Sequence, residues 1–181
     1  MKLGNLGHHF VTITEHKWIV MKNCFRVGLY RQGLLHDLSK YGPEEFFTGV
    51  RYYQGDRSPN AAEREVLGFS KAWLHHKGRN KHHSEYWIDF SLDFKEGLVG
   101  HKMPLPYAIE MVMDRIAASK TYKGKAYTNQ SPLEYYRFSK DHMVIHPDTR
   151  ALLEKLLYML RDEGEAKTFA YMKQLLKKES Y

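Results

Sequence analysis

Apolar side chains recur at three- and four-residue steps along most of this 181-residue chain, a spacing that is typical of amphipathic helices. No stretch alternates apolar and polar residues as a half-buried strand does. Glycine and proline divide the pattern into helices, predicted over residues 8–30, 34–42, 43–55, 60–76, 106–122, from 131 onward, 152–164 and 165–178. We therefore expect an all-α bundle of about seven to eight helices.

Two local signals refine these boundaries. Asn60 with Glu63, and Ser131 with Glu134, have the spacing of a capping box at a helix start. Residues 89–106 contain two glycines and two prolines and are expected to be irregular. The buried line of the helix over 60–76 is expected to include Val66, Phe69 and Trp73, with His76 next in step.

The length suits one domain with a full hydrophobic core, which we expect to span residues 1–181. The only cysteine, Cys24, excludes a disulfide framework and suits a reducing compartment. No stretch approaches the roughly 18 consecutive apolar residues of a membrane span. These features predict a cytoplasmic protein that does not enter a membrane.

The charge balance bears on partners. Lys and Arg number 28 against 21 Asp and Glu, a net charge of +7. This excess favours an anionic partner, either a phosphorylated small molecule or nucleic acid, although solubility alone also accounts for it. Because no predicted helix concentrates Lys and Arg on one face and no nucleic-acid-binding motif is present, nucleic acid is possible but not favoured.

The most distinctive stretch is Leu34–Pro43, which contains the His36-Asp37 pair. An imidazole and a carboxylate together suit a divalent transition metal. Adjacent residues on a helix diverge by about 100°, so both side chains can reach one ion only near a helix end. The Gly42-Pro43 break that follows places such an end nearby.

Other residues of metal-binding type lie on the predicted helices. His16 falls on the apolar stripe of the first helix, where it is either a ligand or an ordinary core histidine. Asp114 lies on the less polar face of its helix, where a carboxylate is costly unless paired or bound to a metal; a surface pair with Arg115 is the alternative. His8 and His9 are expected to be solvated at the start of the first helix.

Three further histidines lie between these elements. His76 is the better inward candidate than His75, which falls one residue off the buried line. His82 and His83 follow a Gly78-Arg79-Asn80 interruption, in a short turn or helix. Histidine-rich and carboxylate-poor, this set favours Fe, Mn, Co, Ni or Zn over Mg.

In this order, His16, His36-Asp37 and Asp114 resemble the pattern of the HD superfamily of metal-dependent phosphohydrolases. The run His36-Asp37-Leu38-Ser39-Lys40 and the element His82-His83-Ser84-Glu85 are similar to motifs of its HD-GYP branch, as is the proline-led helix from Pro104 to Asp114. The Gly-Tyr-Pro of that branch is missing, since Tyr86-Trp87-Ile88 stands in its place. The resemblance covers about residues 8–122, and the C-terminal helices at about 131–178 lie outside it.

The resemblance implies an HD-like helical fold and one or two divalent metal ions. It implies a first ion held by His16, His36, Asp37 and Asp114, with Asp37 bridging to a second ion held by His76 and by His82, His83 or both. Asp37 and Lys40 would then be catalytic, and Lys40 and Arg115 would contact the phosphate of a nucleotide or related phosphoester.

Two other functions stay open at this point. A di-iron site of HD type also supports oxygenase chemistry, which keeps the metals and changes the reaction. A basic helical module that binds nucleic acid would instead use the histidines for structure, and a degenerate HD domain would sense a nucleotide without turnover. The sequence does not decide the oligomeric state.

Overall fold

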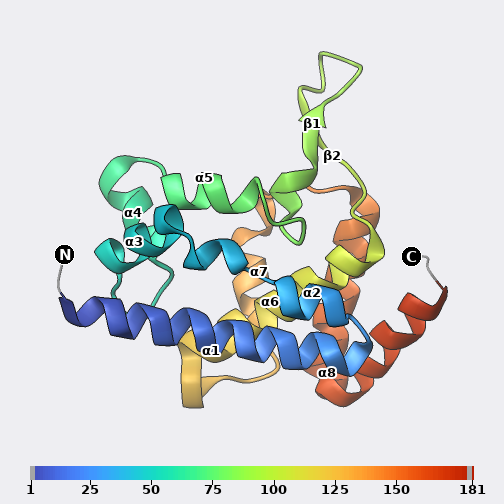
Figure 1. Ribbon diagram of the computed structural model, residues 1–181. Coiled ribbons are helices and arrows are strands. Elements are labelled where there is room, and N and C mark those ends of the chain that lie inside the picture. Colours follow the sequence, from blue (N-terminus) through green and yellow to red (C-terminus); the bar gives the residue numbers. More distant parts are fainter. Residues whose placement is uncertain (1–2, 179–180) are drawn as a thin grey trace.

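The computed structural model describes residues 3–178 and 181, and within them the chain is mostly helical (Figure 1). Eight α-helices and one two-stranded antiparallel sheet are present there, which confirms the predicted all-α class. The helices are α1 (Leu3–Val27), α2 (Tyr30–Leu35), α3 (Pro43–Tyr52), α4 (Pro59–Leu67), α5 (Lys71–Lys77), α6 (Leu105–Lys123), α7 (Ser131–Ser139) and α8 (Pro147–Lys178). Short 3-10 turns are η1 (Leu38–Tyr41), η2 (Ser84–Trp87), η3 (Gly124–Ala126) and η4 (Lys140–His142), and the strands are β1 (Ile88–Phe90) and β2 (Leu98–Gly100).

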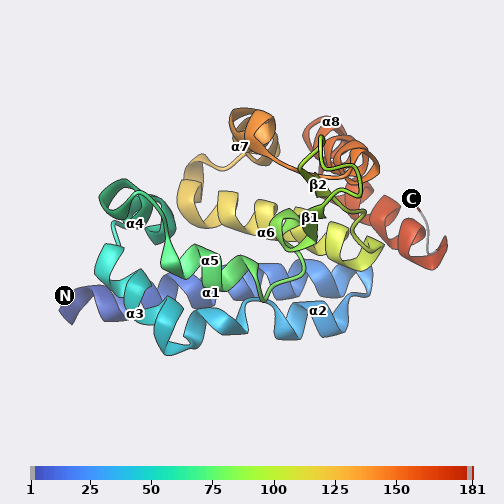
Figure 2. The same cartoon turned by 90° about the horizontal axis from the view of Figure 1, so that it is seen from above.

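Helix α6 is the centre of the bundle. It lies between α1 on one side and α7 and α8 on the other (Figure 2), and apolar residues on most of its circumference are buried. The C-terminal half of α1 and the first half of α8 complete an aliphatic core with it, built from Val20, Cys24, Val27, Ile109, Val112, Ile116, Leu153, Leu156, Leu157 and Leu160.

Glycine ends two of the helical segments. The predicted break at Gly164 is confirmed, since this residue has a φ of 79° and interrupts α8. The single helix predicted over 60–76 is wrong. Gly68, with a φ of 80°, ends α4, and the Ser70 hydroxyl accepts a hydrogen bond from the Trp73 backbone to begin α5.

This break changes which side chains are buried. Val66 and Phe69, expected inside, are 69% and 45% exposed. The predicted capping boxes are also wrong: Glu63 instead accepts a hydrogen bond from the Ser70 hydroxyl at 2.5 Å, and the Ser131 hydroxyl accepts one from the Thr128 backbone. Neither predicted pair of residues therefore caps a helix start.

Residues 89–106, expected to be irregular, contain the β1–β2 hairpin, in which Asp89 pairs with Val99. The hairpin stands off the helical body (Figure 1). Its strands are three residues long, too short for an alternating pattern to reveal them. No helix within residues 3–178 has the length and apolar character needed to cross a membrane.

Candidate metal centre

Imidazoles and carboxylates from distant parts of the chain meet beside α6. Helix α1 contributes His16, the segment between α2 and η1 contributes His36 and Asp37, and α5 contributes His76. His82 and His83 come from the turn before η2, and α6 contributes Glu110 and Asp114. Every predicted metal ligand therefore lies in one buried cluster, which we call the histidine centre.

The backbone between α2 and η1 turns His36 and Asp37 toward the same side. Helix α2 ends at Leu35, and Asp37 adopts a left-handed conformation with a φ of 53°, the only non-glycine residue described with a positive φ. The Lys17 ammonium donates to the carbonyls of Leu34 and His36 at 2.8 and 2.7 Å, which satisfies this helix end. The side chains of His36 and Asp37 therefore converge at a helix end, as expected from the sequence.

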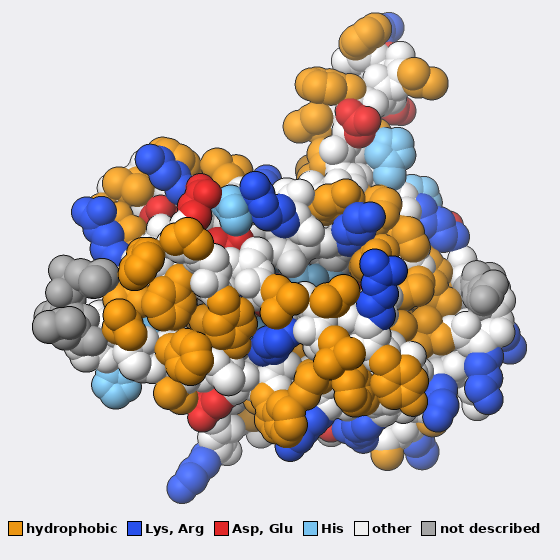
Figure 3. Space-filling model, in the orientation of Figure 1, with side chains coloured by type: hydrophobic (Ala, Val, Ile, Leu, Met, Phe, Trp, Pro, Cys, Tyr) orange, Lys and Arg blue, Asp and Glu red, His pale blue; other side chains and the backbone are white. Residues whose placement is uncertain are grey.

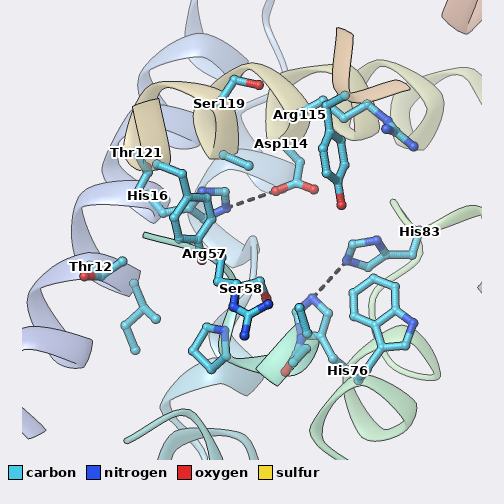
Figure 4. A pocket seen from close by; sticks show the side chains of 18 of the residues that line it. Thr12, His16, Arg57, Ser58, His76, His83, Asp114, Arg115, Ser119 and Thr121 are labelled. Atoms are coloured by element: carbon cyan, nitrogen blue, oxygen red, sulfur yellow. Dashed lines mark hydrogen bonds and ion pairs between the residues drawn. The ribbon is translucent and has the colours of Figure 1, made fainter. Parts of the chain in front are cut away.

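A first group of potential ligands surrounds Oδ2 of Asp37. Nε2 of His36 and Nε2 of His16 lie 3.3 and 3.6 Å from this oxygen. Oδ1 of Asp114 lies 3.0 Å from Nε2 of His16 and 3.6 Å from Nε2 of His36 (Figure 4). One atom from each of these four residues falls within 4.8 Å of the others, a spacing that one metal ion can span.

A second group surrounds the other oxygen of the same carboxylate. Oδ1 of Asp37 lies 3.2 Å from Nε2 of His76 and 3.4 Å from Nε2 of His82. Nε2 of His83 lies 2.9 Å from Nε2 of His76 (Figure 4). Asp37 therefore stands between two groups of four residues each and belongs to both.

Two buried glutamates orient these rings from behind. Oε1 of Glu110 lies 2.9 Å from Nδ1 of His36 and 3.3 Å from Nδ1 of His82. Oε2 of Glu45 lies 2.7 Å from Nδ1 of His76. Since a carboxylate only accepts, Nδ1 of His36 and His76 carries the hydrogen, and in the neutral ring Nε2 is then a lone pair directed into the centre.

The resulting arrangement lacks partners that a cation would supply. Oδ2 of Asp37 is ion-paired with the Lys40 ammonium, whereas Oδ1 of Asp37 and Nε2 of His82 are buried and have no hydrogen-bond partner within the described chain. Lone pairs of neutral imidazoles close to one another or to carboxylate oxygens repel unless a proton or a metal ion lies between them. The donor set therefore fits a metal.

Without a metal ion, the carboxylates of the centre favour protonated rings at His36 and His76. Burial opposes charge on His36, yet the pKa of its imidazole is raised well above its ordinary value by Asp37, Asp114 and Glu110. Burial likewise opposes ionisation of Asp37 and Asp114, but the surrounding histidines, with Lys40 in the case of Asp37, hold both carboxyl pKa values well below their usual range. The pKa of His83 is lowered by burial and by the neighbouring His82 and His76, so its ring is neutral and free to coordinate.

A pocket of about 740 Å³ opens onto the centre. Nζ of Lys40 lies in its wall, 2.5 Å from Oδ2 of Asp37; burial opposes the ammonium, but Asp37 and Asp114 raise its pKa. Arg115 also lines the pocket, where its Nε is buried without a partner in the described chain and its only hydrogen bond there runs to the Met143 sulfur. Both residues predicted to contact phosphate therefore line the cavity that opens onto the ligand groups.

Some site residues were not predicted. Glu110 lies one turn before Asp114 on the same helix face, a spacing that was available in the sequence. Glu45 has no such signal, because it reaches His76 only through tertiary packing of α3 on α5. His75 contacts Glu45 and Glu44 and stays outside both ligand groups.

The expectation that His9 is solvated is wrong. Its ring is 5% exposed and packs on Phe46 and Tyr53. It also lies against Gly49, where a Cβ would overlap the imidazole. Burial, with a smaller contribution from Lys40, lowers the pKa of His9 to about 4, so this pocket histidine is neutral.

Comparison with known proteins places the chain in a family without assigning it a reaction. The family described as "Family of unknown function (DUF5662)" matches residues 6–159. This range includes the whole histidine centre and the helices that carry it. No curated protein and no solved structure matches the chain.

Proposed function

The chain belongs to DUF5662, a family of unknown function, and we propose from the geometry of its centre that it is a metal-dependent phosphohydrolase. Its substrate would be a phosphoester, a nucleotide or a related phosphorylated small molecule. The observation that carries the proposal is the position of Asp37, whose two oxygens face two separate groups of ligands. A carboxylate that bridges two ions is a recurring feature of centres that hydrolyse phosphoesters.

The ligand assignment follows the two groups. His16, His36, Asp37 and Asp114 would hold one ion, and Asp37, His76, His82 and His83 the other. Imidazole-rich sets of this kind favour Fe, Mn, Co, Ni or Zn over Mg. When bound, divalent ions lower the pKa of coordinated water toward neutrality and offset phosphate charge. The likeness to HD-type phosphohydrolases noted in the sequence points to the same chemistry.

The chain's own residues would bind and orient the substrate. The Lys40 side chain is about a quarter exposed and lines the pocket, where its ammonium can donate to a phosphoryl oxygen while Asp37 holds it in place. Arg115 pairs with no carboxylate within the described chain and can give its guanidinium to a second oxygen. Glu110 and Glu45 keep the imidazoles of His36 and His76 oriented toward the centre.

A di-iron oxygenase is the second candidate, and the ligand set is the observation that supports it. A bridging carboxylate with several imidazoles also suits iron, and the carboxylates behind the rings make those imidazoles more basic. Ultraviolet–visible absorption of the iron-loaded, aerobically prepared protein distinguishes the two. A non-catalytic nucleotide-binding module is the third reading, and it predicts nucleotide binding without release of phosphate.

The test is a phosphoester panel assayed with the metal-free protein and with the protein reloaded with Mn²⁺ or Co²⁺. The panel includes nucleoside monophosphates and triphosphates, cyclic nucleotides and a chromogenic aryl phosphate, and the readout is release of inorganic phosphate or of phenol. We expect turnover of at least one substrate that requires added metal. Lys40→Met should lower kcat/KM by about 10²-fold or more if the ammonium stabilises transition-state charge.

Two control variants make the result specific. Asp37→Ala should abolish turnover, whereas Asp93→Ala, an exposed acid on the hairpin, should leave it unchanged. Phosphate release that persists in Asp37→Ala would overturn the proposal. So would the absence of turnover of every phosphoester in protein that has bound its full complement of metal.

A further inference from the structure

The β1–β2 hairpin exposes an apolar surface that the centre does not use. Phe90, Leu92, Phe94 and Leu98 are 72%, 101%, 90% and 55% exposed. They lie on a projection that stands clear of the helices (Figures 1 and 3). Four large apolar side chains exposed together on one protrusion indicate an interaction site, whereas single exposed apolar residues scattered over a surface do not.

A second apolar surface lies on the helical body. It consists of Trp18 and Phe25 on α1 with Tyr30 and Leu34 on α2, and we call it the α1–α2 patch. These side chains are 53%, 37%, 61% and 55% exposed. The rings of Phe25 and Tyr30 are in edge contact, with centroids 5.2 Å apart, and Figure 3 shows apolar side chains over this face with basic ones among them.

The two surfaces carry opposite charge. Residues 88–100 contain three acids, Asp89, Asp93 and Glu96, and one base, Lys95. Residues 14–35 contain four bases and a single acid, Glu15. Two of those bases, Lys22 and Arg31, are exposed and form no ion pair within the described chain, and Lys22 lies over the Trp18 ring.

We propose that the hairpin of one chain docks on the α1–α2 patch of a second copy, and that two such contacts form a homodimer. In a two-fold dimer each hairpin reaches the other chain's patch, so the contact closes on itself. Like charge argues against pairing of two hairpins, and acidic residues argue against an anionic membrane surface as the partner. The basic patch of the same protein is the surface that complements the hairpin.

The available area suffices for a stable dimer. Large apolar side chains bury on the order of 150 Å² each, so one hairpin contributes roughly 500 Å². Two contacts, with both sides counted, then bury on the order of 2,000 Å², which lies in the range of specific interfaces. The hairpin directly follows His82, His83 and η2, so the dimer contact is covalently close to the histidine centre.

The test measures the mass of the full chain by light scattering at about 50 μM, where a specific interface of this size is populated. We expect twice the chain mass of 21.4 kDa for the wild type. The hairpin variant Leu92→Lys with Phe94→Lys should be monomeric, because it sets bases against a basic patch. The patch variant Tyr30→Glu with Leu34→Glu should be monomeric for the converse reason.

Mixing the two variants provides the decisive comparison. An equimolar mixture should recover the dimer, since one contact is native and the other pairs lysines with glutamates. Circular dichroism and metal content should match the wild type in both variants, because these side chains are exposed. A monomeric wild type, a variant that still dimerises, a mixture that stays monomeric, or hairpin-dependent sedimentation with phosphatidylserine vesicles would each overturn the proposal.

Discussion

Helices α1 and α6 each pass through two regions with opposite chemistry. His16 on α1 and Asp114 on α6 belong to the histidine centre. Val20 and Val27 on α1 and Ile109 on α6 belong to the aliphatic core with α8. Burial of apolar atoms in the core is favourable without any further component, whereas buried charges in the centre are costly until a partner satisfies them.

This difference separates two properties of the molecule. The core determines whether the helices assemble, because its contacts are complete within the chain. The centre determines what the assembled helices bind, because Oδ1 of Asp37 and Nε2 of His82 are buried without a hydrogen-bond partner in the described chain. Variants in the two regions should therefore affect different measurements.

The largest effect is expected from Asp37→Ala. Because Asp37 belongs to both ligand groups, the variant should lose both bound ions while its far-ultraviolet circular dichroism stays helical. Elemental analysis of the purified protein checks this. Asp93→Ala is the matched control, and retention of full metal content by Asp37→Ala would show that the two groups do not depend on this carboxylate.

Leu156→Ala should show the opposite behaviour. This side chain is fully buried in the α8 part of the core, and its truncation should lower the free energy of unfolding by about 2–5 kcal/mol. Denaturant titration measures the loss, and the folded variant should still bind metal in wild-type amount. Val66→Ala on α4, where the side chain is 69% exposed, should change stability by less than about 0.5 kcal/mol; equal effects at the two positions would contradict the described core.

Glu110→Gln should produce an intermediate change in metal affinity. Its carboxylate orients the rings of His36 and His82, and loss of such a partner costs about 10- to 100-fold in affinity. Competition with a chromogenic chelator measures it. Glu134→Gln, an exposed acid that pairs with Lys123, is the control, and an unchanged affinity in Glu110→Gln would rule out the orienting role.

The pH dependence of stability should differ between metal-free and metal-loaded protein. In the metal-free protein the pKa of His36 is raised above 6.5 by the surrounding carboxylates, so its stabilising contribution is present below that value and is lost as pH rises through the raised pKa. The lowered pKa values of Asp37 and Asp114 act in the other direction, with a contribution that is lost only as pH falls below 3.8.

Thermal melts with a chelator should therefore show declining stability from about pH 6.5 upward, a small effect spread over several pH units. With metal present the trend should reverse, because binding requires neutral imidazoles and releases protons. A chelated protein whose melting temperature stays flat or rises over this interval would contradict the charged state described for His36.

Much of this architecture was predictable, and the failures have physical reasons. Periodicity identified α1, α3 and α6 because each is long or begins at a clear proline signal. The division of α4 from α5 was missed although Gly68 marks it, since the apolar pattern continues across the glycine. The hairpin was missed because three-residue strands carry no usable alternation.

The residues of the histidine centre also divide into those that the sequence predicted and those that it did not. His36 and Asp37 were identifiable because they are adjacent and lie before a Gly-Pro break. Glu45, in the first turn of α3, reaches His76 through packing between helices that no local pattern encodes. His9 was misjudged because its burial depends on the absence of a side chain at Gly49.

If the proposed metal assignment is correct, Asp37 is shared by two cations. Titration of chelated protein with Co²⁺, followed by absorption and by elemental analysis after gel filtration, measures how many ions each chain holds. The geometry predicts two ions per chain for the wild type and none for Asp37→Ala. Binding of a single ion by the wild type, or of none, would contradict it.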